Sequence, residues 1–167
     1  MNMIVGVGNP LRRDEGVGIA AIARLNDHYH LPDGVCAVDA GTPGLALLDI
    51  VRDARAVVLI DAMTADQPPG TIYQVDPARL RSRGPEWSES LHGVSLLGTI
   101  HLAEAVGMRV PPITIVGVEP AVLDWGEGLS EPVATALDLV AAIALGLSTS
   151  DPHHPTRHRR KEVPVST

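Results

Sequence analysis

Three side chains that could bind a metal ion or transfer a proton each lie next to a different predicted element. Glu15 comes at the start of the first predicted helix, Asp61 ends the most apolar strand signal, and His92 lies just before another helix. Two carboxylates and one imidazole make a ligand set for a divalent transition ion with open coordination positions. Such a site could polarise a carbonyl group and activate water. Spacing alone does not establish it, because no two of the three share a local motif such as H-E-x-x-H.

Each of these side chains also has an ordinary structural explanation. Asp14 and Glu15 could do no more than complement the helix dipole, which is worth ~0.3–1 kcal/mol. An aspartate that ends a strand, as Asp61 does, often only forms a turn with nearby backbone. A lone loop histidine such as His92 is solvated more often than it binds a metal, and His101 is a competing imidazole inside a predicted helix. These explanations weaken only because the three candidates are expected at one edge of a sheet.

Strand-like and helical segments alternate along the chain, which is typical of an α/β domain. Strands are expected at residues 3–7, 35–39, 56–61, 71–75 and 113–118, and the fourth of them could run antiparallel. Helices are expected after residue 14, at 45–51, at 93–106 and from Ser130 to Gly146. The strand at 56–61 is nearly all apolar, so we expect it at the centre of the sheet with both faces covered. Open α/β sheets place their sites at the carboxyl ends of the strands, where the three candidate ligands should converge.

The glycine-rich stretch from Gly6 to Gly18 lies between a strand and a helix but does not fit a dinucleotide-binding loop. The G-x-G-x-x-G fingerprint needs a third glycine for close packing of helix and strand, and Leu11 occupies that position. Asp14 and Glu15 would also repel a pyrophosphate at the helix start, where that fold binds an anion. We therefore interpret the stretch as a loop that delivers a carboxylate to the sheet edge.

The length and composition predict one domain followed by a tail. A chain of 167 residues has room for a single domain, which we place at residues 1–148. Residues 149–167 contain three prolines, three histidines and a basic cluster without apolar periodicity, so a disordered tail is predicted. The tail histidines could bind metal weakly, although a solvated tail is favoured.

The charge balance is acidic, with 20 Asp and Glu residues against 13 Lys and Arg. An acidic domain argues against binding nucleic acid or an anionic membrane surface, because both attractions need clustered Lys and Arg. No signal peptide and no apolar segment long enough to cross a membrane is expected. The single cysteine, Cys36, excludes an internal disulfide and fits a reducing cytoplasm, where we expect the protein.

Several blocks of sequence occur in order over about residues 3–145. They are Gly6–Asn9 with Asp14–Gly18, Asp39–Gly44, Ile60–Ala62 and Leu91–Gly93, and Thr114–Pro120 is a weaker addition. Together they resemble the hydrogenase maturation endopeptidases, which trim the large subunit of nickel–iron hydrogenases. The combination is specific, although each block alone is not. The resemblance implies a three-layer α/β/α fold with a twisted, mostly parallel five-stranded sheet.

The resemblance also implies a site and a substrate. The family's metal ligands and catalytic residues map onto Glu15, Asp61 and His92. Residues that would contact the substrate are Asp39, Gly41 and Thr42, with simple turn formation as the alternative. The implied substrate is the nickel-loaded precursor of a nickel–iron hydrogenase large subunit, which loses a short C-terminal peptide. Nickel would then arrive within the substrate, other divalent ions could occupy the site in vitro, and either carboxylate could act as general base.

Two other functions stay open at the level of sequence. The protein could be a non-catalytic nickel-sensing assembly factor that binds the hydrogenase precursor without cutting it. It could also be a nucleotide-binding α/β domain, although the acidic loop already argues against that function.

Overall fold

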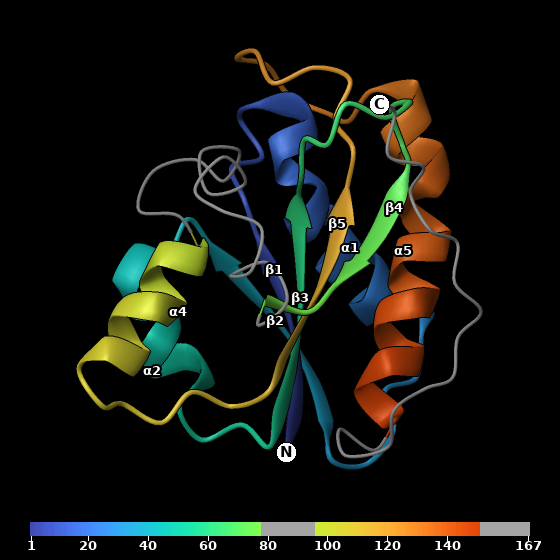
Figure 1. The fold of residues 1–167 in the computed structure, drawn as a ribbon. Coiled ribbons are helices and arrows are strands. Elements are labelled where there is room, and N and C mark those ends of the chain that lie inside the picture. Colours follow the sequence, from blue (N-terminus) through green and yellow to red (C-terminus); the bar gives the residue numbers. More distant parts are fainter. Residues whose placement is uncertain (78–95, 151–167) are drawn as a thin grey trace, which may run out of the picture.

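The computed structural model describes residues 1–77 and 96–150, which form a five-stranded sheet between helices (Figure 1). The strands are β1 (Asn2–Val7), β2 (Val35–Gly41), β3 (Ala56–Ala62), β4 (Ile72–Val75) and β5 (Ile113–Val118). Their order across the sheet is β2-β1-β3-β5-β4. All neighbouring pairs are parallel except β4 and β5, which are antiparallel. The expected mostly parallel five-stranded sheet is therefore confirmed.

Helices cover both faces of this sheet. On one face lie α1 (Val17–His28), which follows the 3₁₀ helix η1 (Arg13–Gly16), and α5 (Glu131–Thr149). On the other face lie α2 (Leu47–Val51), which follows the 3₁₀ helix η2 (Gly44–Ala46), and α4 (Leu96–Ala105). The three-layer α/β/α arrangement is thus confirmed. The predicted disordered tail and the first three residues of the predicted helix at 93–106 lie outside the described ranges.

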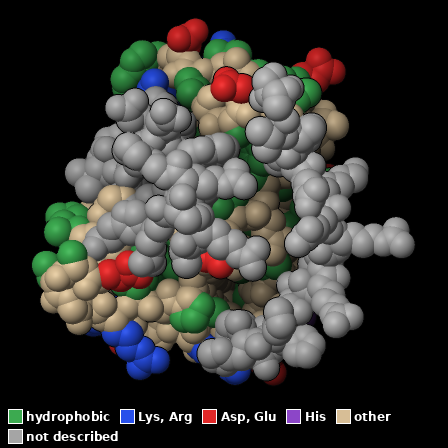
Figure 2. All heavy atoms as spheres, in the orientation of Figure 1, with side chains coloured by type: hydrophobic (Ala, Val, Ile, Leu, Met, Phe, Trp, Pro, Cys, Tyr) green, Lys and Arg blue, Asp and Glu red, His purple; other side chains and the backbone are tan. Residues whose placement is uncertain are grey.

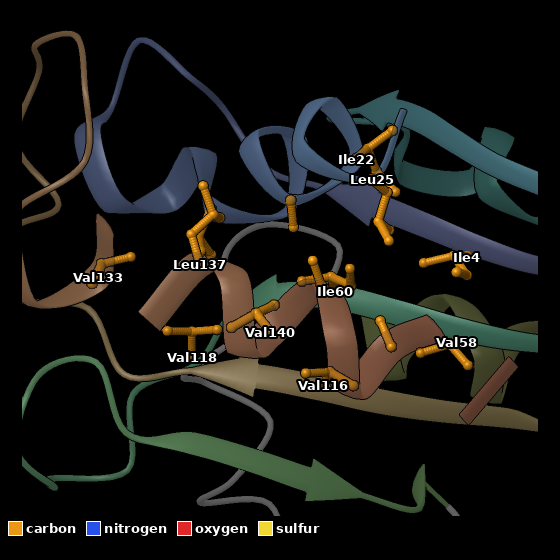
Figure 3. Close-up of a cluster of buried hydrophobic side chains, with 14 residues drawn as sticks. Ile4, Ile22, Leu25, Val58, Ile60, Val116, Val118, Val133, Leu137 and Val140 are labelled. Carbon is orange, nitrogen blue, oxygen red and sulfur yellow. The ribbon is translucent and has the colours of Figure 1, made fainter. Parts of the chain in front are cut away.

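The strands divide their side chains between two apolar clusters, because successive residues of a strand point to opposite faces. The larger cluster joins the sheet to α1 and α5 (Figure 3), and its strand members are Ile4, Val58, Ile60, Val116 and Val118. The smaller cluster joins the sheet to α2, and its members are Val5, Val7, Leu47, Val51, Val57 and Leu59. Strand β3 contributes to both clusters and lies third of five, so its predicted central position is confirmed. By the same alternation, Asp61 lies on the face of Leu59, toward α2.

The layer formed by α2 and α4 has a partly apolar outer surface. Apolar side chains of α4 and of the turn after it stay exposed, with exposed fractions of 48% for Leu102, 65% for Val106 and 43% for Met108. Figure 2 shows hydrophobic side chains at the left edge of the molecule, where α4 lies in Figure 1. These apolar side chains belong to the helical layer that covers the Asp61 side of the sheet.

Helix α5 begins where the sequence predicts but ends later, and its N-cap residue has a different role. It continues past Gly146 to Thr149, because a lone helical glycine is tolerated and Ser148 is buried in the last turn. The Ser148 hydroxyl donates a hydrogen bond to the Leu145 carbonyl at 2.8 Å. At the other end, Ser130 occupies the N-cap position as predicted, but its hydroxyl does not cap the helix. It donates instead to the Asp14 carboxylate at 2.8 Å.

Helix α5 also corrects the expectation that the chain has no apolar segment long enough for a membrane. The helix has 19 residues, its most apolar 18-residue window has a mean hydropathy of 1.6, and it meets the length and composition of a membrane span. The helix packs its buried residues, among them Leu137, Val140 and Ala144, against the sheet and α1 (Figure 3). This core position accounts for the apolar composition, since the same residues would be selected for burial in a protein interior.

Candidate active site

Close approach at glycines brings the start of α1 against the ends of β1 and β3. A Cβ atom on Gly18 would lie 2.3 Å from the Val7 carbonyl oxygen and 2.4 Å from that of Ile60. At Gly8, where φ is 130°, a Cβ atom would lie 1.8 Å from the carbonyl oxygen of Glu15. Residues with a side chain do not fit at these distances, so glycine is required at both positions. The glycine-rich stretch from Gly6 to Gly18 therefore places Glu15 beside the end of β3.

Asp14 anchors this loop to the opposite side of the sheet edge. Its carboxylate is fully buried and accepts hydrogen bonds from the backbone N–H groups of Ala121, Val122 and Ser130 and from the Ser130 hydroxyl, at 2.6–2.9 Å. Burial would raise the pKa of Asp14, but these donors outweigh it and hold the pKa below its ordinary value of 3.8. Asp14 is thus an ionised structural tie between η1 and the segment from β5 to α5. The sequence did not predict this anchoring role.

Glu15, the next residue, forms an ion pair with Arg12 and is not surrounded by hydrogen-bond donors as Asp14 is. Its Oε2 atom lies 2.7 Å from Nη1 of Arg12, with 16% of the Glu15 side chain and 28% of the Arg12 side chain exposed. Oε2 is shielded from solvent, yet among the residues the structure describes no donor reaches it in hydrogen-bonding geometry. The carboxylate is consequently held by charge and remains available to a further cation.

Asp61 lies at the end of β3, directly opposite Gly117 of β5. Burial raises the pKa of Asp61 to about 7, a hydrogen bond from the Ala62 backbone opposes the shift, and the negative charge of Glu15 adds to it. The negative charge of Glu15 acts on Asp61, although 46 positions separate the two residues in the sequence. The elements that carry these two candidate ligands, η1 and β3, meet at this edge of the sheet.

The third candidate ligand, His92, lies outside the described residues. Within residues 1–77 and 96–150, no three His, Cys, Asp or Glu side chains form a group that could hold a metal ion. The candidate ligands that lie within the described residues are therefore Glu15 and Asp61.

The residues expected to contact substrate lie at the carboxyl end of β2. Asp39 is exposed, and its Oδ1 accepts a hydrogen bond from the Gly41 backbone N–H at 2.9 Å. This is the turn that the sequence analysis kept as the alternative explanation for Asp39. The Gly41 carbonyl accepts from the Gly8 N–H at 2.8 Å, so the turn is fastened to the glycine loop that carries Glu15. Thr42 is exposed beside it.

Comparison with known proteins decides the family. The family model described as hydrogenase maturation protease matches residues 19–147. A hydrogenase expression/formation protein HupM from Azotobacter chroococcum is 38% identical over 145 residues, covering 86% of this chain and 69% of that protein. A putative hydrogenase maturation protease from Methanocaldococcus jannaschii is 34% identical over 148 residues, covering 86% and 94%. The chain belongs to the hydrogenase maturation protease family.

The solved structure of the hydrogenase maturating endopeptidase HybD from E. coli matches this protease with a TM-score of 0.74 and 27% identity, covering 87% of this chain and 90% of that one. Family membership confirms the resemblance drawn from the sequence blocks and the expected enzyme class, an endopeptidase. The nucleotide-binding alternative is not supported by these relatives.

The protease contains a second buried acidic residue that the sequence analysis did not single out. Glu119 follows β5, is 4% exposed, and accepts hydrogen bonds from the Ala65 N–H at 2.9 Å and from the Tyr73 hydroxyl. Burial, together with this bond and the Glu119 charge, raises the pKa of Tyr73. The contacts tie the loop after Asp61 to β4 and β5. Such long-range ties leave no local motif, since their partners come from distant parts of the chain.

Proposed function

We propose that this protease removes a C-terminal peptide from the nickel-loaded precursor of a nickel–iron hydrogenase large subunit. The family membership supports proteolysis in hydrogenase maturation. The observation that supports the finer statement is the close packing of the start of α1 against the ends of β1 and β3, which places the segments that carry Glu15 and Asp61 at one edge of the sheet. Two carboxylate groups at this edge suit a divalent cation that arrives with its substrate.

In this proposal Glu15, Asp61 and His92 bind the nickel carried by the precursor and so align the scissile peptide bond. The substrate's nickel would supply Lewis-acid polarisation of a carbonyl group or a water molecule. Glu15 and Asp61 are the two candidates for the general base that accepts a proton from the attacking water. Asp39, Gly41 and Thr42 would contact the polypeptide on the β2 side, where the exposed turn faces solvent. The reaction is assigned to the cytoplasm, in keeping with the single cysteine.

The test compares nickel-loaded and nickel-free precursor incubated with the purified protease, with the released peptide identified by mass spectrometry. Cleavage of the loaded form alone is expected. Glu15→Gln, Asp61→Asn and His92→Ala should each slow cleavage by about 100-fold or more. Asp49→Asn is a matched control, because Asp49 lies on α2 with 81% of its side chain exposed.

Three results would overturn parts of the proposal. Equal cleavage of both precursor forms removes the role of nickel. Full activity of His92→Ala removes that residue from the ligand set. Tight binding of an intact precursor that is never cut favours the non-catalytic assembly factor.

A further inference from the structure

Arg12 makes three separate contacts that converge on its guanidinium group. Nη1 lies 2.7 Å from Oε2 of Glu15, and Nη2 donates a hydrogen bond to the Leu123 carbonyl at 3.0 Å. The guanidinium carbon also lies 5.9 Å from the centre of the Trp125 ring, within cation–π range. The Arg12 guanidinium therefore makes contacts through two of its nitrogens and one of its faces at the same time.

The segment that holds Arg12 is itself fixed against the glycine loop. The Gly126 N–H donates to the Leu11 carbonyl at 2.8 Å, and the Arg13 N–H donates to the Gly126 carbonyl at 3.0 Å. The buried Asp14 carboxylate adds its hydrogen bonds to Ala121 and Val122 in the same segment. The guanidinium thus reaches Glu15 from a rigid support, and Trp125 covers it while staying 75% exposed.

The Glu15 carboxylate depends on Arg12 for its orientation. Among the described residues, Glu15 Oε2 has no hydrogen-bond donor in bonding geometry, so the ion pair to Arg12 is its recorded polar contact. The ion pair is made through Oε2, one of the two carboxylate oxygens. Catalytic groups lose efficiency steeply when they are misplaced by about 1 Å. A residue that fixes Glu15 therefore has a measurable consequence for the reaction.

We propose that Arg12 is a positioning residue for Glu15. The Leu123 carbonyl and the Trp125 ring hold the Arg12 guanidinium, which in turn orients the Glu15 carboxylate toward the substrate's cation. The expected effect of Arg12 on the cleavage rate rests on the proposed function, whereas the orientation of Glu15 by Arg12 does not. Arginine suits the task because its planar fork serves the carboxylate and the carbonyl together, whereas lysine presents one point charge. The simpler alternative is a surface ion pair between residues three apart, of little consequence.

The experiment is a double-mutant cycle on cleavage of nickel-loaded precursor, with Arg12→Gln, Glu15→Gln and the double variant. Arg12→Gln should lower kcat/KM by about 10-fold or more, because Glu15 loses its orientation. In the Glu15→Gln background the same change should cost nothing further, since Arg12 acts through Glu15. Arg12→Lys should restore part of the loss. Arg13→Gln is the charge-matched control on the adjacent exposed arginine and should stay within about twofold of wild type.

A measurement without substrate separates this inference from the proposed function. Nitrogen-15 NMR of the Arg12 guanidinium should show slow rotation in the free protein and faster rotation in Glu15→Gln and in Trp125→Leu. If the wild type cleaves no precursor but the rotation is restricted as expected, the function fails and the positioning stands. Free rotation in the wild type, additive losses in the cycle, or an equal loss in Arg13→Gln would each overturn the positioning role.

Discussion

Two acidic regions lie next to one another at the carboxyl edge of the sheet and differ in how the protein treats their charge. Asp14 is surrounded by three backbone N–H groups and one hydroxyl, which hold its pKa below the ordinary value despite complete burial. Among the described residues, Asp61 receives one backbone hydrogen bond, from Ala62, and burial together with the Glu15 charge raises its pKa to about 7. Asp14 is thus kept ionised by donors from the chain, whereas the pKa of Asp61 lies close to neutrality. The comparison separates a carboxylate fixed for structure from one whose protonation can change near neutral pH.

The largest expected effect on stability comes from replacing the Asp14 carboxylate. Asp14→Asn places an amide NH₂ among hydrogen-bond donors, so that donors face one another in a buried site. We expect a loss of about 3 kcal/mol or more in the free energy of unfolding, measured by urea denaturation at pH 7. Asp49→Asn, on an exposed side chain, should change it by less than ~0.5 kcal/mol. A comparable loss in both variants would contradict the anchoring role.

The pH dependence of that loss gives a second test. The pKa of Asp14 is lower in the folded protein than its ordinary value of 3.8, so its ionised form stabilises the fold. This contribution is fully present above about pH 4 and is lost as the pH falls through the folded pKa. The stability gap between wild type and Asp14→Asn should therefore be constant near neutrality and shrink in acid. A stability difference between the two proteins that grows below pH 4 would show that the ionised Asp14 does not stabilise the fold.

Asp61 should behave in the opposite way. Because its folded pKa of about 7 exceeds the ordinary 3.8, the unfolded chain releases this proton first, and the contribution of Asp61 to stability falls as pH rises between these values. Asp61→Asn should match wild type near pH 4 and exceed it by about 1–2 kcal/mol at pH 8, a range reduced for partial solvent exposure. Paired denaturation curves at the two pH values provide the measurement. A variant less stable than wild type at pH 8 would show that Asp61 is structurally required.

The smallest effect concerns the coupling between the two carboxylates of the candidate site. Glu15→Gln removes the negative charge that contributes to the raised pKa of Asp61, while burial, the larger cause, remains. The pKa of Asp61, followed by carbon-13 NMR of its carboxyl group, should fall by less than about one unit. The neighbouring change Asp14→Glu is unsuitable as a control because it disturbs the anchor, whereas Asp39→Asn changes an exposed carboxylate on β2. An equal shift from Asp39→Asn would mean that general charge, and not the Glu15 neighbour, sets the pKa.

Much of the fold was predictable because its signals are local. Apolar runs marked all five strands to within two residues at either end, and the apolarity of residues 56–61 placed β3 at the centre. The end of α5 was not predictable from Gly146, since hydrogen bonds from Ser148, Thr149 and Ser150 to nearby helix carbonyls continue the last turn. Local rules treat that glycine as a stop, although a buried last turn favours the longer helix.

The sequence could indicate candidate ligands but not the contacts that surround them. Glu15 and Asp61 could be paired from the topology of parallel strands, because carboxyl ends meet at one edge. Arg12 gave no signal, since its role depends on Leu123 and Trp125, which lie more than a hundred positions away. His92 stays a prediction, because it lies outside the described residues.

The sequence by itself determined the α/β architecture and the family, because periodicity and the order of the motif blocks can be read from the residues alone. Only the tertiary structure decided that Asp14 is an anchor and that Arg12 pairs with Glu15. Asp14 and Glu15 are adjacent and chemically alike, and the family resemblance points to Glu15 without showing how either side chain is held. They differ through their partners, four donors from residues 121–130 for Asp14 and the Arg12 guanidinium for Glu15, and these partners are brought close only by folding.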